Sequence, residues 1–235
     1  MPVLTTELNP RSEAHRANAQ AMQALVDDLE ATLEKRVKRQ LLEEVRSITP
    51  KNVTLISVRQ PVALGLGNAI MCAYPVVGHN PFAILLPDVL VDQHQCDPAR
   101  DNLAAMMARY SETGASQIMV EPVPGNMVNQ YGIVDLNAAS LIAGTSATIT
   151  DMIEKPAIGE APSNFAITGR YVLSEHIWDL LAHIPPGAGD EIQLTDAMAQ
   201  MIGQQPFHAV RFHGDRYDCG DKIGFLEACV SVALA

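Results

Sequence analysis

The feature that most constrains this sequence is the apolar run Phe82–Leu86, which is followed at once by Pro87 and Asp88. An unbroken apolar run of this length is typical of a strand buried on both faces, as in a parallel sheet covered by helices. In such α/β sheets ligands bind outside the carboxyl ends of the strands, so Asp88 is expected at a ligand crevice. The alternative is that Asp88 only caps a turn, since Pro-Asp is common in turns.

Composition limits the classes of protein that fit. The 235 residues are 48% hydrophobic and 18% charged, which predicts a folded chain with a sizeable core. A net charge of −11 disfavours binding to nucleic acid, because phosphate contacts need a basic face. The four cysteines show no CxxC spacing, and no apolar run reaches the length of a membrane span. We therefore expect a cytoplasmic protein with no membrane partner and no disulfide framework.

Strands and helices are expected to alternate in the first half of the chain. A helix from Ser12 to about Ser47 carries apolar residues every three or four positions, and its basic cluster Glu34–Arg39 is either solvated surface or a contact to phosphate or a partner. The order of the following elements predicts right-handed crossovers and a parallel sheet. These elements are a strand at Val53–Val58, a short helix from Ile70 to Tyr74, strand Phe82–Asp88, helix Asn102–Glu112 and strand Gln117–Glu121.

The pattern changes beyond Pro122. Strands at Tyr131–Leu136 and Thr148–Ile153, separated by Gly- and Ser-containing turns, suggest an antiparallel insertion. Phe165–Leu173 is expected to re-enter the main sheet. The remaining elements are predicted as helices at Glu175–Ala182 and Leu194–Ile202, a strand at His208–Phe212 and a last helix at Lys222–Leu234.

Several short strings could carry chemistry. Gly65-Leu66-Gly67, between a strand and a helix, either lets the backbone approach a ligand or is a plain tight turn. Glu154-Lys155 could bind sugar hydroxyls and a phosphate, or form only a surface ion pair. Asp88 and Asp218 could together hold one Mg²⁺ ion with phosphate ligands. Cys219 is more simply explained as a packed thiol.

Taken together, these strings resemble the bacterial UTP–glucose-1-phosphate uridylyltransferases, also called UDP-glucose pyrophosphorylases. The resemblance runs in consistent order from about Leu29 to Ala228. The strings that carry it are Leu33–Leu42, Gly65-Leu66-Gly67, Leu86-Pro87-Asp88, Glu154-Lys155-Pro156, Gly169-Arg170-Tyr171, Pro185–Ala197 and Tyr217-Asp218-Cys219-Gly220.

The resemblance implies a Rossmann-like nucleotide-diphospho-sugar transferase fold, with a mixed, mostly parallel sheet flanked by helices. It implies a nucleotidyltransferase that forms UDP-glucose and pyrophosphate from UTP and glucose 1-phosphate with Mg²⁺, and a homo-oligomer. By position in the motifs, Asp88, Lys155 and Asp218 are the catalytic residues, with Asp88 and Asp218 holding the metal. The residues implied in substrate binding are Gln60 and Gly65 for uracil, and Gly132 and Glu154 for glucose.

The sequence also departs from the family pattern. Family members carry a Gly-rich basic loop of the type GxGTRxLPxTK, and this sequence has no counterpart; residues 1–28 stand in its place as an atypical leader and helix. Residues 29–235 are then an incomplete, N-terminally truncated transferase domain, and we expect impaired catalysis. The alternatives are a non-catalytic paralogue that binds UDP-sugar or assembles with a complete enzyme, and a gene fragment that does not fold stably alone.

Overall fold

The computed structural model describes residues 13, 17, 20, 23–28, 43–44, 47–48, 50 and 52–234. The chain divides into two compact units, Met1–Ser57 and Val58–Ala235. In the first unit residues 13, 17, 20, 23–28, 43–44 and 47 are helical, in agreement with the predicted helix, and Val26 of its apolar stripe is 40% exposed. The predicted basic cluster at 34–39 lies outside the described residues.

The predicted strand at Val53–Val58 is wrong. Residues 53–60 form neither strand nor helix, and Leu55 is 81% exposed. The β-branched composition of this segment favours a strand, but a strand also needs a neighbour to accept its backbone hydrogen bonds. No described strand pairs with it.

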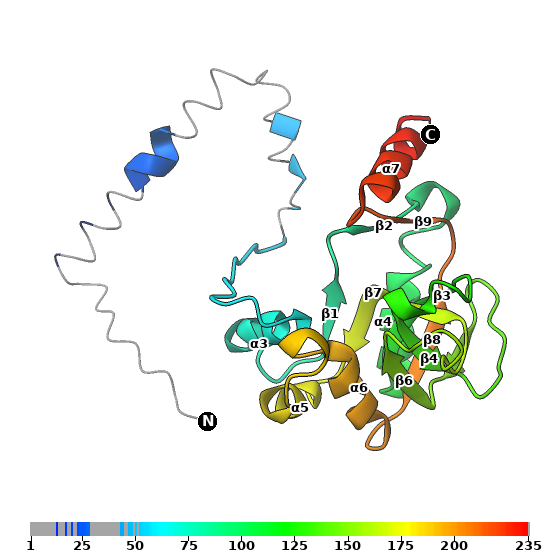
Figure 1. The fold of residues 1–235 in the computed structure, drawn as a ribbon. Coiled ribbons are helices and arrows are strands. Elements are labelled where there is room, and N and C mark those ends of the chain that lie inside the picture. The colour runs from blue at the N-terminus through cyan, green and yellow to red at the C-terminus, as the bar shows by residue number, and fades with distance from the viewer. Residues whose placement is uncertain are drawn as a thin grey trace. The chain divides into compact units, whose positions relative to one another are not determined.

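The second unit is built on a seven-stranded sheet in the order β5-β8-β3-β7-β4-β6, with β1 also paired to β7 (Figure 1). The α/β class, with helices flanking a mixed sheet, is confirmed. The strands are β1 (Phe82–Leu85), β3 (Ser116–Pro122), β4 (Gly132–Asp135), β5 (Ser146–Thr148), β6 (Asp151–Glu154), β7 (Phe165–Leu173) and β8 (Phe207–Arg211).

The expectation of a mostly parallel sheet is wrong at the level of strand pairs. Among the described strands only β3 and β8 pair in parallel, and the other pairs of this sheet are antiparallel. The cause is β7, which runs opposite to its neighbours and has β1 and β4 along one edge and β3 along the other. Strands β1 and β3 share a direction, as the crossover argument requires, but β7 separates them.

The predicted strand Thr148–Ile153 is in fact two strands. β5 ends at Thr148 and pairs with β8, whereas β6 begins at Asp151 and pairs with β4. These two strands stand at opposite ends of the strand order and are joined by only Ile149 and Thr150, so the sheet must curl on itself. The antiparallel pairing of β4 with β6 confirms the predicted antiparallel insertion.

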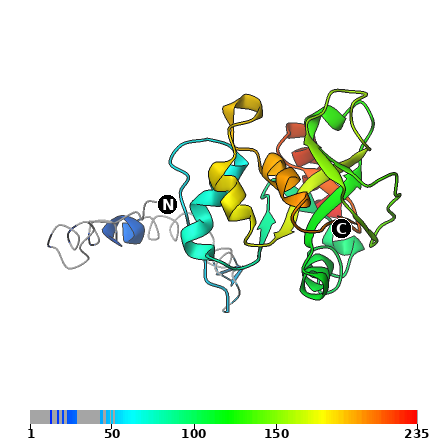
Figure 2. The same ribbon diagram turned by 90° about the horizontal axis from the view of Figure 1, so that it is seen from below.

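Helices cover both faces of the sheet, because successive side chains of a strand point to opposite faces. Ile118 of β3 packs in the larger core cluster with α3 (Leu66–Val77), α5 (Ile177–His183) and α6 (Leu194–Ile202). The next residue, Met119, packs in a second cluster with Met106 of α4 (Leu103–Thr113). Figure 2 shows α3, α5 and α6, in cyan, yellow and orange, gathered on one side and the green α4 away from them.

β1 is shorter and less buried than predicted. It ends at Leu85, and its residues alternate between half-buried and exposed positions, with Leu85 itself 51% exposed. Among the described strands β1 pairs only with β7, so its other edge remains open and the burial on both faces that we expected does not occur. The chain then turns at Pro87 and Asp88.

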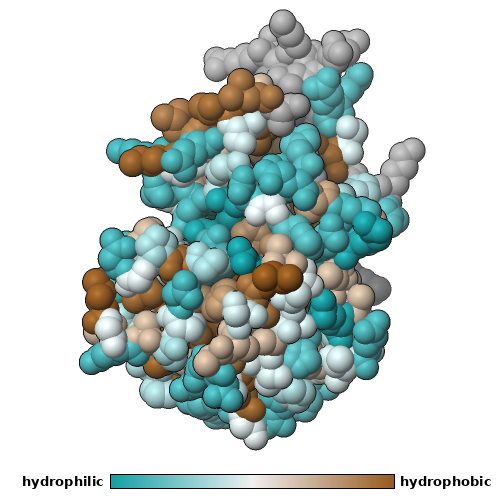
Figure 3. Space-filling view, turned by 90° about the vertical axis from the view of Figure 1, so that its right-hand side faces the viewer, coloured by the Kyte–Doolittle hydropathy of each residue, from teal (hydrophilic) through white to brown (hydrophobic). Residues whose placement is uncertain are grey.

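A small ribbon that the sequence did not reveal follows this turn. β2 (Val89–Val91) pairs with β9 (Arg216–Asp218), and α7 (Lys222–Leu234) comes after β9. α7 turns small residues inward: Gly224 and Ala228 are buried, and the Tyr217 hydroxyl donates to Ser231 Oγ at 2.7 Å. Its exposed apolar residues are Ile223, Phe225, Leu226, Val230, Val232 and Leu234. Figure 3 shows hydrophobic side chains gathered at the top of the face where α7 stands in Figure 1.

Three short 3₁₀ helices complete the described fold, η1 (Gln93–Gln95), η2 (Val128–Gln130) and η3 (Ala188–Asp190). None of the described helices is both long and apolar enough to cross a membrane.

Candidate functional site

One cavity of about 380 Å³ brings together most of the residues that the sequence singled out. Its lining includes Asp88, Gly132, Glu154, Lys155 and Asp218. These residues come from the turn after β1, from β4, from the end of β6 and from β9, so distant parts of the chain meet here.

The two aspartates are held side by side by the backbone. The Cys219 N–H donates to the Asp88 carbonyl at 2.7 Å, and Val89 pairs with Asp218 across the ribbon. A Cβ placed on Gly220 would stand 3.1 Å from Asp218 Oδ1 and 3.2 Å from Asp88 Oδ2. One oxygen of each carboxylate therefore lies near the same point beside Gly220.

The donor set fits a hard divalent cation that is shared with a ligand. No group of three or more His, Cys, Asp or Glu side chains in the described part of the chain could hold a metal. Mg²⁺ is commonly bound by one or two carboxylates together with substrate phosphates and water, rather than by an all-protein cage. A pair of converging aspartates matches that mode.

A second group of polar atoms surrounds Gly132. Gly132 lies opposite Glu154 in the β4–β6 pair, and Thr195 reaches the same place from α6. A Cβ on Gly132 would stand 3.1 Å from both Glu154 Oε2 and Thr195 Oγ1. The missing side chain thus leaves space between a carboxylate and a hydroxyl, which suits hydrogen bonding to the hydroxyl groups of a sugar.

Lys155 has an unusual backbone conformation. Its φ of 46° lies in the left-handed region, which is uncommon for residues other than glycine, and its N–H donates to the Tyr131 carbonyl at 3.0 Å. The ammonium lies 3.8 Å from Glu154 Oε1, and the Lys155 side chain is 54% exposed. An ion pair at this distance with a half-exposed ammonium is weak, so the ammonium remains available to an anion in the cavity.

Gln60 and Gly65 contact each other rather than the cavity. Gln60 Nε2 donates to the Gly65 carbonyl at 3.1 Å and to Asn68 Oδ1 at 2.9 Å. Neither residue lines the cavity, although Leu66, the first residue of α3, does. The structure thus places these two predicted residues at its border.

The glycines at the start of α3 have a structural reason. The Gly67 N–H donates to the Ile192 carbonyl at 2.9 Å, and a Cβ on Gly67 would stand 2.7 Å from that oxygen. A Cβ on Gly65, whose φ is 89°, would stand 2.7 Å from Glu191 Cβ. Close approach of the Pro185–Ala197 loop to α3 therefore requires these glycines, whether or not a ligand does.

Sequence reasoning missed several residues of the cavity wall. Arg216 contacts both Asp218 and Glu121, and Tyr171 of β7 is buried. Burial raises the pKa of the Tyr171 hydroxyl, with nearby Glu154 adding to the effect, so it stays protonated. Tyr171 lies inside a string that carried the family resemblance and Arg216 directly precedes one, but their roles depend on partners far away in the sequence.

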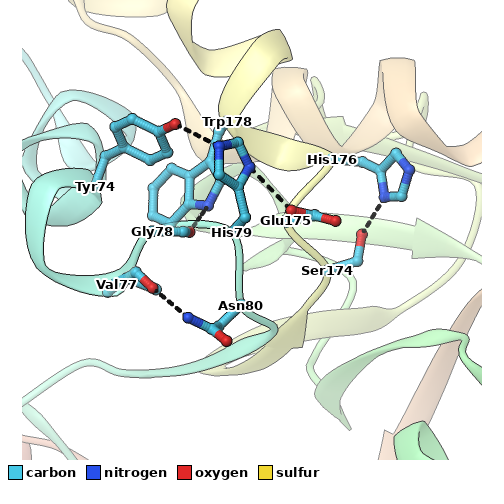
Figure 4. Close-up of polar contacts among 9 residues, drawn as sticks. All are labelled: Tyr74, Val77, Gly78, His79, Asn80, Ser174, Glu175, His176 and Trp178. Atoms are coloured by element: carbon cyan, nitrogen blue, oxygen red, sulfur yellow. Dashed lines mark hydrogen bonds and ion pairs between the residues drawn. The ribbon is translucent and has the colours of Figure 1, made fainter.

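A polar cluster outside the cavity fixes the other end of α3 (Figure 4). His79 Nδ1 lies 3.0 Å from Glu175 Oε2, and His79 Nε2 lies 3.0 Å from the Tyr74 hydroxyl. Trp178 donates from Nε1 to the Gly78 carbonyl at 3.0 Å and stacks on Phe82 with ring centroids 4.5 Å apart. These contacts join α3 to α5 and β1, which is a structural role.

The nucleotidyltransferases are the class of protein with which both the sequence and the fold of this chain agree. The sequence model of the family described as "Nucleotidyl transferase" matches residues 15–233. The UTP–glucose-1-phosphate uridylyltransferase of Haemophilus influenzae is 55% identical over 207 residues, which are 88% of this chain and 70% of that protein. The enzyme of the same name from Escherichia coli K12 is 53% identical over 207 residues, covering 88% and 68%.

Solved structures agree. The UTP-bound UGPase from Acinetobacter baumannii matches with a TM-score of 0.75 and 46% identity, over 88% of this chain and 70% of that one. A UDP-glucose pyrophosphorylase complexed with UDP-glucose matches with a TM-score of 0.73 and 34% identity, over 83% and 71%. The chain belongs to the family of UTP–glucose-1-phosphate uridylyltransferases, a family of enzymes, as its sequence motifs predicted.

Proposed function

We propose that this chain transfers a uridylyl group from UTP to glucose 1-phosphate and so forms UDP-glucose and pyrophosphate. The observation that carries the proposal is the single cavity in which the aspartate pair, the Gly132–Glu154 pocket and Lys155 meet. Relatives that are 53–55% identical to this chain over 207 residues carry the name of that activity.

Each polar group has a part in this reaction. Glu154 accepts hydrogen bonds from glucose hydroxyls in the space left by Gly132. Lys155 Nζ meets the phosphate of glucose 1-phosphate and orients it for in-line attack on the α-phosphorus of UTP. Gln60 and Gly65, at the border of the cavity, contact the uracil. No covalent intermediate with the protein is needed, because the attacking group is the sugar phosphate itself.

Asp88 and Asp218 would hold a divalent cation, which we propose is Mg²⁺. A cation held there would neutralise charge on the nucleotide phosphates. The chain's own contribution is to hold the two carboxylates close together. We further propose that the chain works in the cytoplasm and assembles as a homo-oligomer.

Pyrophosphate release from UTP, glucose 1-phosphate and Mg²⁺ tests the proposal. Asp88→Ala should lower the rate at least about a hundredfold, since removal of one preorganised electrostatic group costs on that order. Asp179→Ala, which removes an exposed aspartate from α5, is the matched control and should leave the rate unchanged.

Two other results would change the proposal. Turnover that survives Asp88→Ala would contradict the assigned role of Asp88. A chain without turnover that UDP-glucose still protects against thermal unfolding would support the other candidate, a UDP-sugar-binding or regulatory relative.

A further inference from the structure

Arg216 is the most buried charged side chain at the border of the cavity, and it contacts two carboxylates. It lies on β9, two residues before Asp218, and its side chain is only 10% exposed. Its Nε donates to Glu121 Oε1, and its Nη1 lies 3.4 Å from Asp218 Oδ2. The guanidinium also sits 5.6 Å from the centre of the Tyr131 ring. One arginine therefore joins an otherwise unassigned glutamate to an aspartate of the candidate metal site.

Glu121 is the anchor of this arrangement. It lies near the end of β3, in the middle of the main sheet, with its side chain 20% exposed. Burial raises the pKa of the Glu121 carboxyl, and Arg216 opposes that shift. A buried carboxylate is strongly unfavourable without a partner, so Glu121 and Arg216 depend on each other. The planar fork of an arginine can serve both carboxylates at once, whereas the point charge of a lysine cannot do so in the same geometry.

The connection matters because Asp218 and Glu121 belong to different sheets. β9 pairs only with β2 among the described strands, and a two-stranded ribbon is marginal on its own. The neighbouring aspartate is held by other means: Arg170 of β7 donates to the carbonyls of Leu86 and Val89, on either side of Asp88. Asp88 is thus fixed through the backbone, whereas the Asp218 carboxylate accepts the Gly220 N–H at Oδ1, 3.1 Å away, and contacts the Arg216 side chain at Oδ2.

We propose that Arg216, anchored by Glu121, is a positioning residue that holds the Asp218 carboxylate beside Asp88 so that the pair can bind a divalent cation together with a nucleotide phosphate. The proposal rests on the function proposed above, because it assumes that the aspartate pair is a metal site. Arg216 also offsets the repulsion between the two carboxylates when no cation is bound. It acts through Asp218 and needs no contact with the reacting atoms.

The test compares Arg216→Lys with Glu121→Gln, and uses Arg109→Lys as the matched control. Arg109 makes similar hydrogen bonds, from Nη1 to Ser146 Oγ and from Nη2 to the Gly144 carbonyl, but it does not line the cavity. Binding of Mn²⁺ in the presence of UTP is measured by electron paramagnetic resonance, which needs no turnover. Pyrophosphate release is then measured against Mg²⁺ concentration and against glucose 1-phosphate concentration.

Arg216→Lys should weaken Mn²⁺ binding about 10- to 100-fold, the usual effect of losing a group that orients a metal ligand. The Mg²⁺ concentration for half-maximal rate should rise by a similar factor, while KM for glucose 1-phosphate stays within about twofold, because Glu154 and Lys155 are untouched. Glu121→Gln should shift both values in the same direction. Glu121→Gln keeps Arg216, so it serves as the test if circular dichroism shows that Arg216→Lys does not fold.

Unchanged Mn²⁺ binding in a folded Arg216→Lys or Glu121→Gln variant would overturn the proposal. An equal loss in Arg109→Lys would do the same, because the effect would then be general destabilisation. If the unmodified chain shows no turnover but Arg216→Lys still weakens Mn²⁺ binding, the proposed reaction fails and the positioning role stands. If the unmodified chain does not bind Mn²⁺ with UTP, the positioning role fails.

Discussion

The main sheet and the ribbon with α7 use apolar residues in opposite ways. On the main sheet Phe207 is 0% exposed, and its neighbours on β3 are equally buried. On α7 Phe225 is 58% exposed, while Gly224 and Ala228 face inward. Burial of apolar surface is the main stabilising term in folding, so stability is concentrated in the main sheet. The candidate site draws residues from both regions, and its geometry therefore depends on polar contacts between them.

The largest difference should come from paired phenylalanine truncations. Phe207→Ala removes a fully buried ring and should lower the free energy of unfolding by about 3–5 kcal/mol. Phe225→Ala on α7 should change it by less than about 0.5 kcal/mol, as is usual for exposed positions. Urea denaturation followed by circular dichroism measures both values. Comparable losses at the two positions would show that the exposed face of α7 is covered in solution.

A glycine substitution gives a smaller and more local effect. A Cβ on Gly224 would stand 2.0 Å from the Asp218 carbonyl oxygen, so Gly224→Ala must push α7 away from β9. We expect a loss of about 1–3 kcal/mol in the stability of this region, seen as faster amide hydrogen exchange in α7. The control is Gly203→Ala, where no atom lies within 4 Å of the added Cβ. Equal exchange rates in the two variants would mean that α7 does not rest on β9 as described.

The smallest effect concerns pH and the main sheet alone. Burial, together with nearby Arg109, lowers the pKa of His208 on β8 below its ordinary value of 6.5. The unfolded chain then binds a proton more readily than the folded chain, so stability should fall as the pH drops below about 6.5. His208→Gln should remove part of this loss. The midpoints of urea denaturation at pH 7 and pH 5 measure this loss in the unmodified chain and in His208→Gln. The prediction is contradicted if the midpoint falls by the same amount in both.

Sequence patterns were sufficient for elements whose environment is local and uniform. α6 at Leu194–Ile202, β7 at Phe165–Leu173 and α7 at Lys222–Leu234 have the predicted bounds, because periodicity and flanking turn residues decide them. The failures concern pairing. Val53–Val58 has the composition of a strand but pairs with no described strand. Residues 148–153 pass from a strand at one end of the sheet order to a strand at the other end, with only two residues between them. Only the complete sheet determines which edge is available.

The same division applies to the candidate site. Asp88 could be inferred from its place after an apolar run, and the cavity does contain it. Arg216 could not, because its significance lies in Glu121, which is 95 residues away. Thr195 became relevant only through the space above Gly132. Motifs identify side chains that are expected to touch a ligand. The groups that hold those side chains in place are identified only from distances between atoms in the folded structure.

The backbone of Lys155 has a consequence for the evolution of this chain. A residue with a side chain pays about 1–2 kcal/mol to adopt the left-handed conformation found here, with φ of 46°, and glycine does not. A glycine at this position would therefore make the protein more stable and remove its ammonium group. Selection for stability alone would not keep a lysine there, and the phosphate-binding role proposed for Lys155 would explain why a less stable residue stands at this position.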